Sequence, residues 1–273
     1  MGRKLFSKKK GDDIKVYKGR ARNYKLEKHK PEKRKKRRKH NFWLRFLIVI
    51  VVIGGIVAFA LSPFFDVTDI QVEGNSYYSA EEIIKMSEGE IGHNIFFGSN
   101  KGGMESNIEE SPYIKSANVK MSLPSTLVIE VEERARAAFV QYGDNYIILD
   151  KEGVVLAKEN KNPQLTQIMK VTVSKVEVGE KLEVEETKNL EESLKLLDMT
   201  LSNGLFFKKI AIQQGTIYGY IFDKLVCKGT FDEMQSVIED GSLAKVLYKL
   251  NQEGITHGTI SIQKGNYLSF SPL

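Results

Sequence analysis

The chain has 273 residues, of which 41% are hydrophobic and 28% charged, and it contains a single cysteine. One cysteine excludes an internal disulfide, so this is not a disulfide-stapled scaffold. The formal net charge of +6 is unevenly distributed, because residues 1–45 hold 20 Lys and Arg against 4 Asp and Glu, whereas residues 46–273 hold 21 against 31. The chain therefore joins a basic N-terminal part to an acidic remainder.

The apolar stretch from Phe46 to Phe65 contains twenty residues and no charge. At about 1.5 Å per residue, a helix of this length can cross a hydrocarbon core of roughly 30 Å. We predict one transmembrane helix over residues 42–65, and the positive-inside rule places the basic part in the cytoplasm and the rest outside. The alternative is a signal peptide cleaved after Ala58-Phe59-Ala60, which the long leader and the continuing apolar run argue against.

Residues 1–41 form a basic tail that we expect to be disordered, because like charges repel and few apolar side chains favour collapse. Its basic run either attracts anionic lipid headgroups, at about 1 kcal/mol per residue near the surface, or only sets topology. Nucleic-acid binding is disfavoured, because no helix-turn-helix or zinc spacing accompanies the charges. The candidate lipid-binding residues are Lys33, Arg34, Lys35, Lys36, Arg37, Arg38 and Lys39.

Beyond the membrane segment, short alternating elements predict a small mixed domain. Ser79 and Glu82 have the spacing of a capping box, which predicts a helix beginning at the next residue. A second short helix is expected over residues 103–111 and is stopped by Pro112. Apolar and polar residues alternate in three predicted strands, at residues 67–72, 116–121 and 126–131, of which the last two form a hairpin.

This β-α-α-β-β order, directly after a membrane helix, resembles a POTRA domain, expected at residues 66–135. The segments FDVTDIQVEGN and SPYIKSANVKMSLPSTLVIEVEERARAAFV resemble the FtsQ/DivIB family of bacterial cell-division proteins in particular. In that family the POTRA unit likewise begins just outside a single membrane helix. The segment FVQYGDNYIILDKEGVVL resembles the opening of the family's second, β-rich domain, expected at residues 136–273. The predicted fold class is therefore α+β.

In the second domain, AAFVQY, NYIILD and VVLA predict a β meander, because turn compositions separate them. A stripe of Leu190, Leu194, Leu197 and Leu201 predicts a helix with a core-facing side, closed by Gly204.

Further strands are expected in FFKKIAIQQ, TIYGYIF and LVCKG, and a capping box at Thr230 and Glu233 predicts another helix. Gly241 is expected to break or kink that helix before a second apolar stripe. The chain ends in a predicted hairpin, GTISIQ and NYLSF, with its turn at Lys264-Gly265.

The sequence contains no recognisable catalytic constellation, and we predict no enzyme activity, cofactor or metal. His93 and His257 are far apart and have no metal-type spacing, which favours exposed loops. Residues 98–103 fit half of a phosphate loop, but Met104 stands where the lysine is required. Cys227 lies in a strand-like context and is expected to be a small buried apolar residue.

The resemblance implies a non-catalytic membrane scaffold at the division septum that binds coiled-coil partners of the FtsL and FtsB/DivIC type. Two alternatives remain open. One is an extracytoplasmic enzyme or wall-polymer binder that uses the β domain. The other is a POTRA-type chaperone or secretion component unrelated to division, and a mid-cell localisation would separate division from both.

The candidate partner site is the last predicted strand, because a terminal strand is often a sheet edge that another chain can extend. Tyr267, Ser269 and Ser271 are expected on one face of that strand, and Leu268 and Phe270 on the other. The resemblance implies the same place, because the family's final strands are where the coiled-coil partner adds. We assign Tyr267, Leu268 and Phe270 to partner binding; the alternative is that Leu268 and Phe270 complete the domain's own core.

Overall fold

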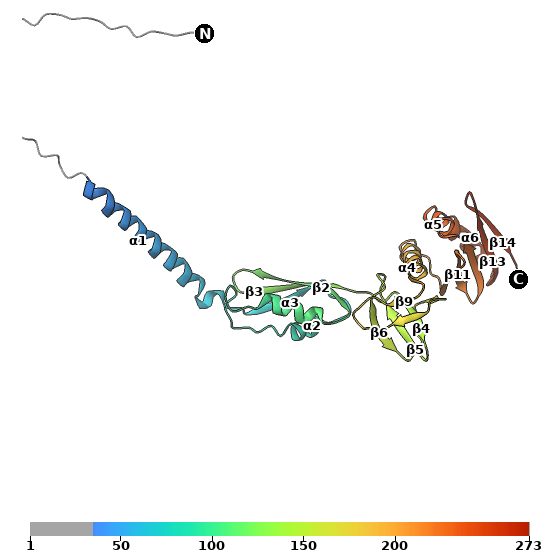
Figure 1. Ribbon diagram of the computed structural model, residues 1–273, viewed down its shortest axis with the longest axis horizontal. Helices are drawn as coiled ribbons and strands as arrows, with labels where there is room; N and C mark the ends of the chain where they lie inside the picture. The colour runs from blue at the N-terminus through green and yellow to red at the C-terminus, as the bar shows by residue number, and fades with distance from the viewer. Residues whose placement is uncertain (1–34, 273) are drawn as a thin grey trace, which may run out of the picture. The chain divides into compact units, whose positions relative to one another are not determined.

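The computed structural model describes the backbone of residues 35–272 and the side chains of residues 42–272. The fold is α+β, as predicted, with an apolar helix followed by two β-containing domains (Figure 1). Lys33 and Arg34 lie outside the described residues, and so do the side chains of residues 35–39. The predicted contacts of the basic run with lipid therefore stay a prediction.

Helix α1 spans Lys35–Ala60, so it includes the last seven residues of the expected basic tail. Its segment Phe42–Ala60 has a mean hydropathy of 2.6 and no buried residue, which makes it a candidate transmembrane helix. The helix ends before Phe65 because Ser62 precedes a proline and adopts an extended conformation. Pro63–Phe65 then form a short 3-10 turn.

The first domain has the predicted β-α-α-β-β order and a three-stranded sheet in which the central strand is the last in sequence. The first strand in sequence pairs parallel with the central strand. The central strand also pairs antiparallel with the remaining strand, and these two form a hairpin. The capping box of Ser79 and Glu82 is confirmed, with both reciprocal hydrogen bonds present. The elements are β1 (Asp69–Glu73), α2 (Ala80–Ser87), α3 (Lys101–Glu109), β2 (Ile114–Ser122) and β3 (Thr126–Glu133).

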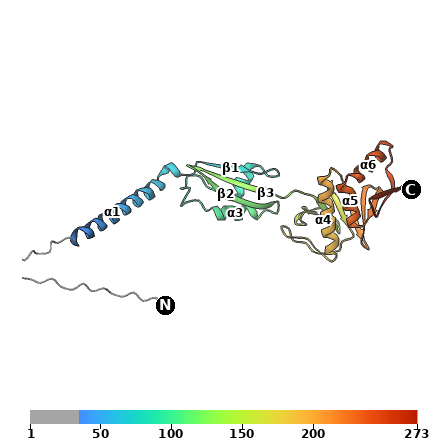
Figure 2. The same ribbon diagram turned by 90° about the horizontal axis from the view of Figure 1, so that it is seen from above.

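The core of this domain lies between its sheet and its two helices. Helix α3 runs along β2 on one face of the sheet (Figure 2). Alternation along β3 buries Leu127, Ile129 and Val131, while helix spacing buries Met104 and Ile108 on α3. These side chains share one hydrophobic cluster with Ile83 of α2, which fixes the helices on the sheet.

In the described part of the chain, the second domain is built on one nine-stranded mixed sheet with the order β14-β13-β12-β11-β10-β7-β4-β5-β6. A separate two-stranded ribbon pairs β8 with β9. The strands are β4 (Ala138–Tyr142), β5 (Asn145–Leu149), β6 (Val155–Glu159), β7 (Thr166–Met169), β8 (Val173–Lys175), β9 (Glu183–Val184), β10 (Lys209–Gln213), β11 (Thr216–Phe222), β12 (Lys224–Gly229), β13 (His257–Gln263) and β14 (Tyr267–Ser271).

Three helices, α4 (Thr187–Ser202), α5 (Phe231–Glu239) and α6 (Ser242–Gln252), pack against one face of this sheet. Leu194 of α4, Met234 of α5 and Leu243 of α6 belong to the same hydrophobic cluster as the inward-facing residues of the strands. The capping box of Thr230 and Glu233 begins α5, as predicted. Gly241, with φ of +72°, separates α5 from α6 and confirms the predicted break.

Two of the differences from the sequence-based expectations concern the core and the large sheet of the second domain. Leu190, Leu194 and Leu197 are buried as predicted, but Leu201 is 49% exposed because it lies in the last turn of α4. Strand β7 was not predicted, although it joins the two halves of the large sheet by pairing parallel with both β4 and β10. Its four residues are too few to show a period, and both partners are distant in sequence.

Candidate partner-binding edge of the second domain

The last strand of the chain, β14, lies at one end of the nine-stranded sheet. It pairs antiparallel with β13, from Gln263 opposite Tyr267 to Thr259 opposite Ser271. Among the described residues, no segment other than β13 forms backbone hydrogen bonds with it. Because alternate N–H and C=O groups of a strand point to opposite sides, β14 presents a row of unpaired groups along its outer side.

The opposite end of the sheet, at β6, is partly covered by the chain itself. The backbone N–H of Val155 donates to the carbonyl of Glu180 at 2.8 Å, and the N–H of Gly179 donates to the carbonyl of Val155 at 2.8 Å. An isolated antiparallel bridge joins Val154 and Lys181 beside them. The two ends of the sheet are therefore unequal, and β14 is the more open one.

The three predicted partner-binding residues occupy different environments on β14. The side chain of Tyr267 is 76% exposed, whereas Leu268 and Phe270 are half-buried and pack against the main hydrophobic cluster of the domain. The ring of Phe270 covers Gly258, where an added Cβ would lie 2.5 Å from the ring. Phe270 therefore holds β14 on its own sheet, and Tyr267 is the one of the three that faces solvent.

The turn of this hairpin is anchored to the junction between α5 and α6. The side-chain amide of Asn266, which has φ of +60°, donates to Oδ2 of Asp240 at 2.7 Å. The other oxygen of Asp240 accepts the backbone N–H of Ser242 at 2.7 Å. Hydrogen bonds from Ser242 and Asn266 hold the pKa of the Asp240 carboxyl below its usual range. The edge strand is thus fixed at its turn as well as along its length.

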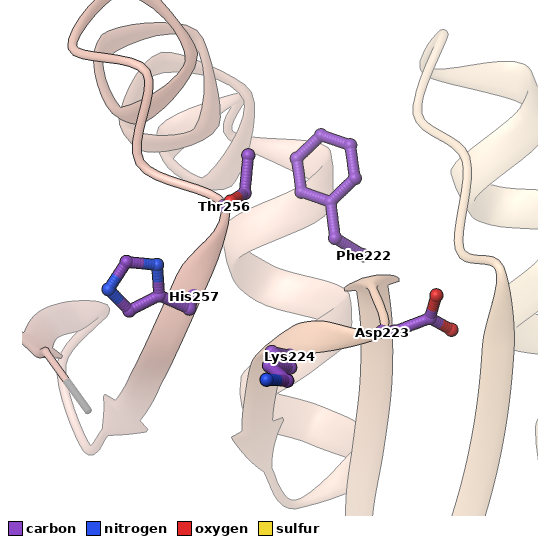
Figure 3. A pocket seen from close by; sticks show the side chains of 5 residues that line it. All are labelled: Phe222, Asp223, Lys224, Thr256 and His257. Carbon is purple, nitrogen blue, oxygen red and sulfur yellow. The ribbon is translucent and has the colours of Figure 1, made fainter.

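A shallow cavity of about 610 Å³ lies where β11 turns into β12 and where β13 begins (Figure 3). No side-chain hydrogen bond joins its lining residues, and His257 and Asp223 point away from each other in Figure 3. The Asp223 carboxylate is instead paired with Lys208 at 2.8 Å, and this pairing lowers its pKa. His257 and Asp223 therefore do not form an acid–base pair. The five lining residues are Phe222, Asp223, Lys224, Thr256 and His257.

The histidines and the cysteine that the sequence analysis considered lie in environments that indicate no catalytic role. His93 is exposed in a loop, as predicted, with Nε2 2.8 Å from Oε2 of Glu90. His257 begins β13 and does not lie in a loop, which corrects that expectation. Cys227 is fully buried, as predicted, and burial raises the pKa of its thiol to about 12. No group of three potential metal ligands occurs in the part of the chain that the structure describes.

The junction between the two domains contains a cluster of charges that the sequence analysis missed. Nη1 of Arg134 lies 2.6 Å from Oδ2 of Asp150 and 2.9 Å from Oε2 of Glu152. Nζ of Lys115 lies 2.7 Å from the other oxygen of Glu152 and 3.2 Å from Glu132. Hydrogen bonds from Lys115 and Arg134 lower the pKa of Glu152 to about 2. This cluster ties β2 and β3 to the turn after β5.

Comparison with known proteins places this architecture in a family. Residues 65–134 match the family described as POTRA domain, FtsQ-type. The cell division protein DivIB of Clostridium acetobutylicum is 30% identical over 171 residues, which cover 56% of this chain and 68% of that protein. The chain belongs to the FtsQ/DivIB family.

Other relatives align over shorter parts of their length. DivIB of Clostridium tetani is 33% identical over 120 residues, which cover 43% of this chain and 45% of that protein. DivIB of Bacillus subtilis is 27% identical over 130 residues, which cover 48% of this chain and 49% of that protein. Membership of the FtsQ/DivIB family and the candidate span of α1 together indicate a division-related membrane protein.

Proposed function

We propose that this chain is a non-catalytic, single-pass membrane scaffold of the division machinery that captures coiled-coil partners of the FtsL and FtsB/DivIC type. In this proposal the N-terminus lies in the cytoplasm, both folded domains lie outside, and the protein acts at the septum. The basic run from Lys33 to Lys39 sets this topology, and we propose that it also attracts anionic headgroups. Sedimentation with anionic vesicles at rising salt measures that attraction, which screening should weaken.

The observation that carries the proposal is the open edge of the nine-stranded sheet at β14. A partner segment that adds as a tenth strand gains main-chain hydrogen bonds from β14 and side-chain contacts from its exposed face. Tyr267, which is 76% exposed, is suited to be an anchor on that face, because tyrosine is enriched among residues that dominate binding energy. We assign Leu268 and Phe270 to the same site as the residues that hold the strand in place.

The test is site-specific photo-crosslinking in dividing cells that express the full-length chain. A photoreactive phenylalanine analogue at Tyr267 should crosslink to FtsL- or DivIC-type proteins. The matched control is Tyr248, which lies on α6 in the same domain and is 67% exposed. Crosslinks to these partners from Tyr248 but not from Tyr267 would move the partner surface away from β14.

A substitution series gives the energetic counterpart. We expect Tyr267→Glu to weaken partner capture by more than about 2 kcal/mol, because it places a charge at an interface anchor. Its thermal stability should stay close to that of the wild type, because the exposed side chain of Tyr267 contributes little to the core. Tyr248→Glu should change neither property. Unchanged capture by Tyr267→Glu, or loss of capture only together with unfolding, would contradict the proposal.

A further inference from the structure

Five large apolar side chains are exposed in the two segments that lie where α1 meets the first domain. They come from two segments, the connection that follows α1 and the loop between α2 and α3. Their exposed fractions run from 39% for Phe96 to 67% for Phe97. The surfaces of soluble proteins rarely expose so many large apolar side chains in one region. We refer to Leu61, Phe64, Ile91, Phe96 and Phe97 as the juxtamembrane patch.

Aromatic rings connect this patch to the end of α1 without interruption. The ring of Phe59, in the last turn of α1, lies 6.3 Å from that of Phe64 and 5.2 Å from that of Phe65. Phe65 in turn contacts Phe96 at 5.2 Å, and Phe96 contacts Phe97 at 6.3 Å. These distances are those of favourable ring pairs, so the loop side chains are packed against the helix end.

Hydrogen bonds tie the loop between α2 and α3 to the end of α1 and to the connection that follows it. The side-chain amide of Asn94 donates to the carbonyl of Ala60 at 2.8 Å, which satisfies one of the carbonyls that a helix end leaves unpaired. The N–H of Ile95 donates to the carbonyl of Phe65 at 2.8 Å, and the N–H of Val67 donates to the carbonyl of His93 at 2.9 Å. The buried side chain of Ile95 anchors the loop in the domain core.

This connection determines how deep the patch lies. The apolar segment Phe42–Ala60 has 19 residues, and at about 1.5 Å per residue it matches the roughly 30 Å thickness of a hydrocarbon core. Ala60 then lies at the boundary between acyl chains and headgroups, and the loop bonded to it lies at that boundary too. Exposed phenylalanines are stable at this depth, where apolar faces of peripheral segments enter by about 5–10 Å.

We propose that the juxtamembrane patch inserts into the outer headgroup–acyl boundary of the bilayer that α1 spans, as a second membrane contact of the first domain. The occupant is lipid, because the patch is continuous with the membrane-spanning segment. None of its five side chains carries a charge, so insertion requires no anionic lipid. The proposal rests on α1 crossing the bilayer and is independent of any division partner.

The test uses the full-length chain, one copy per nanodisc, in phosphatidylcholine. Single cysteines introduced by Phe97→Cys or Ile91→Cys carry an environment-sensitive fluorophore. The native Cys227 does not compete for the label, because its thiol is buried and its pKa is raised to about 12. Glu73→Cys is the control, because this exposed residue ends β1 at the opposite end from the connection to α1. Ile53→Cys, within α1, reports insertion of the helix itself.

We expect the fluorophore at positions 91 and 97 to emit at shorter wavelength than at position 73. Nitroxide-labelled lipid should quench it at least twofold more strongly, and aqueous iodide should quench it less. Equal iodide quenching at positions 91, 97 and 73 would show that the patch faces water and would overturn the proposal. Shielding from iodide without quenching by lipid nitroxide would indicate that protein covers the patch, and this too would overturn the proposal. A fluorophore at position 53 that lipid nitroxide does not quench would show that α1 does not cross the bilayer, which also overturns the proposal.

Discussion

The charge cluster at the domain junction gives a quantitative prediction for Arg134→Ala. The side chain of Arg134 is 16% exposed and that of its partner Asp150 only 3%, so this is the most buried ion pair among the described residues. Removing the guanidinium leaves the Asp150 carboxylate buried without a cation. Breaking a buried pair in this way costs about 3–5 kcal/mol.

The cost at this site should be smaller, for two reasons. Oδ1 of Asp150 keeps the backbone N–H donors of Glu152 at 2.9 Å and Val154 at 2.8 Å. Water can also approach the space that Arg134 leaves, because part of its side chain is already exposed. We therefore expect a loss of about 2–3 kcal/mol in the free energy of unfolding of the second domain. At about 2–4 °C per kcal/mol, the melting temperature should fall by about 4–12 °C.

The assay is urea and thermal unfolding of a soluble fragment comprising residues 66–273, monitored by far-ultraviolet circular dichroism. Lys115→Ala is the matched control, because it removes the other cation of the same cluster from an exposed position where solvent screens the charge. Arg134→Lys should recover part of the loss, since it restores the charge without the planar guanidinium. Equal losses for Arg134→Ala and Lys115→Ala would refute the argument that burial of Asp150 decides the cost.

Two further predictions follow from the same geometry and from the edge strand. The folded-state pKa of Glu152 is about 2, below its usual value near 4.3, so its contribution to stability is complete above about pH 5 and is lost as the pH falls towards 2. Glu152→Gln should flatten this pH dependence of the free energy of unfolding. An unchanged pH profile in that variant would contradict the prediction. Gly258→Ala places a Cβ 2.5 Å from the Phe270 ring, at φ of +134°, and should destabilise the second domain by about 1–3 kcal/mol, with faster amide exchange across β14. Gly102→Ala, on α3 of the first domain and with open space around it, should destabilise neither domain.

Local patterns in the sequence predicted the local structure well. The two capping boxes begin α2 and α5 because the side chains that satisfy the first N–H groups lie only three residues apart. The hairpin of β13 and β14 follows from alternation around a glycine-containing turn, and its place at the sheet edge agrees with the terminal position of β14. These features depend on neighbours in sequence, which is why a single chain reveals them.

Features that depend on distant residues were not predictable in the same way. The Arg134–Asp150 pair joins two domains across a turn, and nothing in its local sequence distinguishes it from solvated charges. Pairing of β12 with β13 is parallel and requires the crossover through α5 and α6, so the hydrophobic pattern alone does not give the strand order. The same holds for the candidate site, where alternation placed Tyr267 on the face opposite Leu268 and Phe270 but could not show that Phe270 covers Gly258.

The parallel pairing of β1 with β3 has a mechanical consequence for a protein tethered to a membrane. The chain enters this pair at Asp69 and leaves it for the second domain after Glu133, and these two points lie at opposite ends of the paired strands. Tension between the membrane and the second domain therefore acts along the strands in shear, and it loads the ladder of hydrogen bonds together rather than one rung after another. The Glu133 carboxylate reinforces the exit end by accepting the N–H groups of Ser76 and Tyr78. The first domain is thus built as a link that resists stretching.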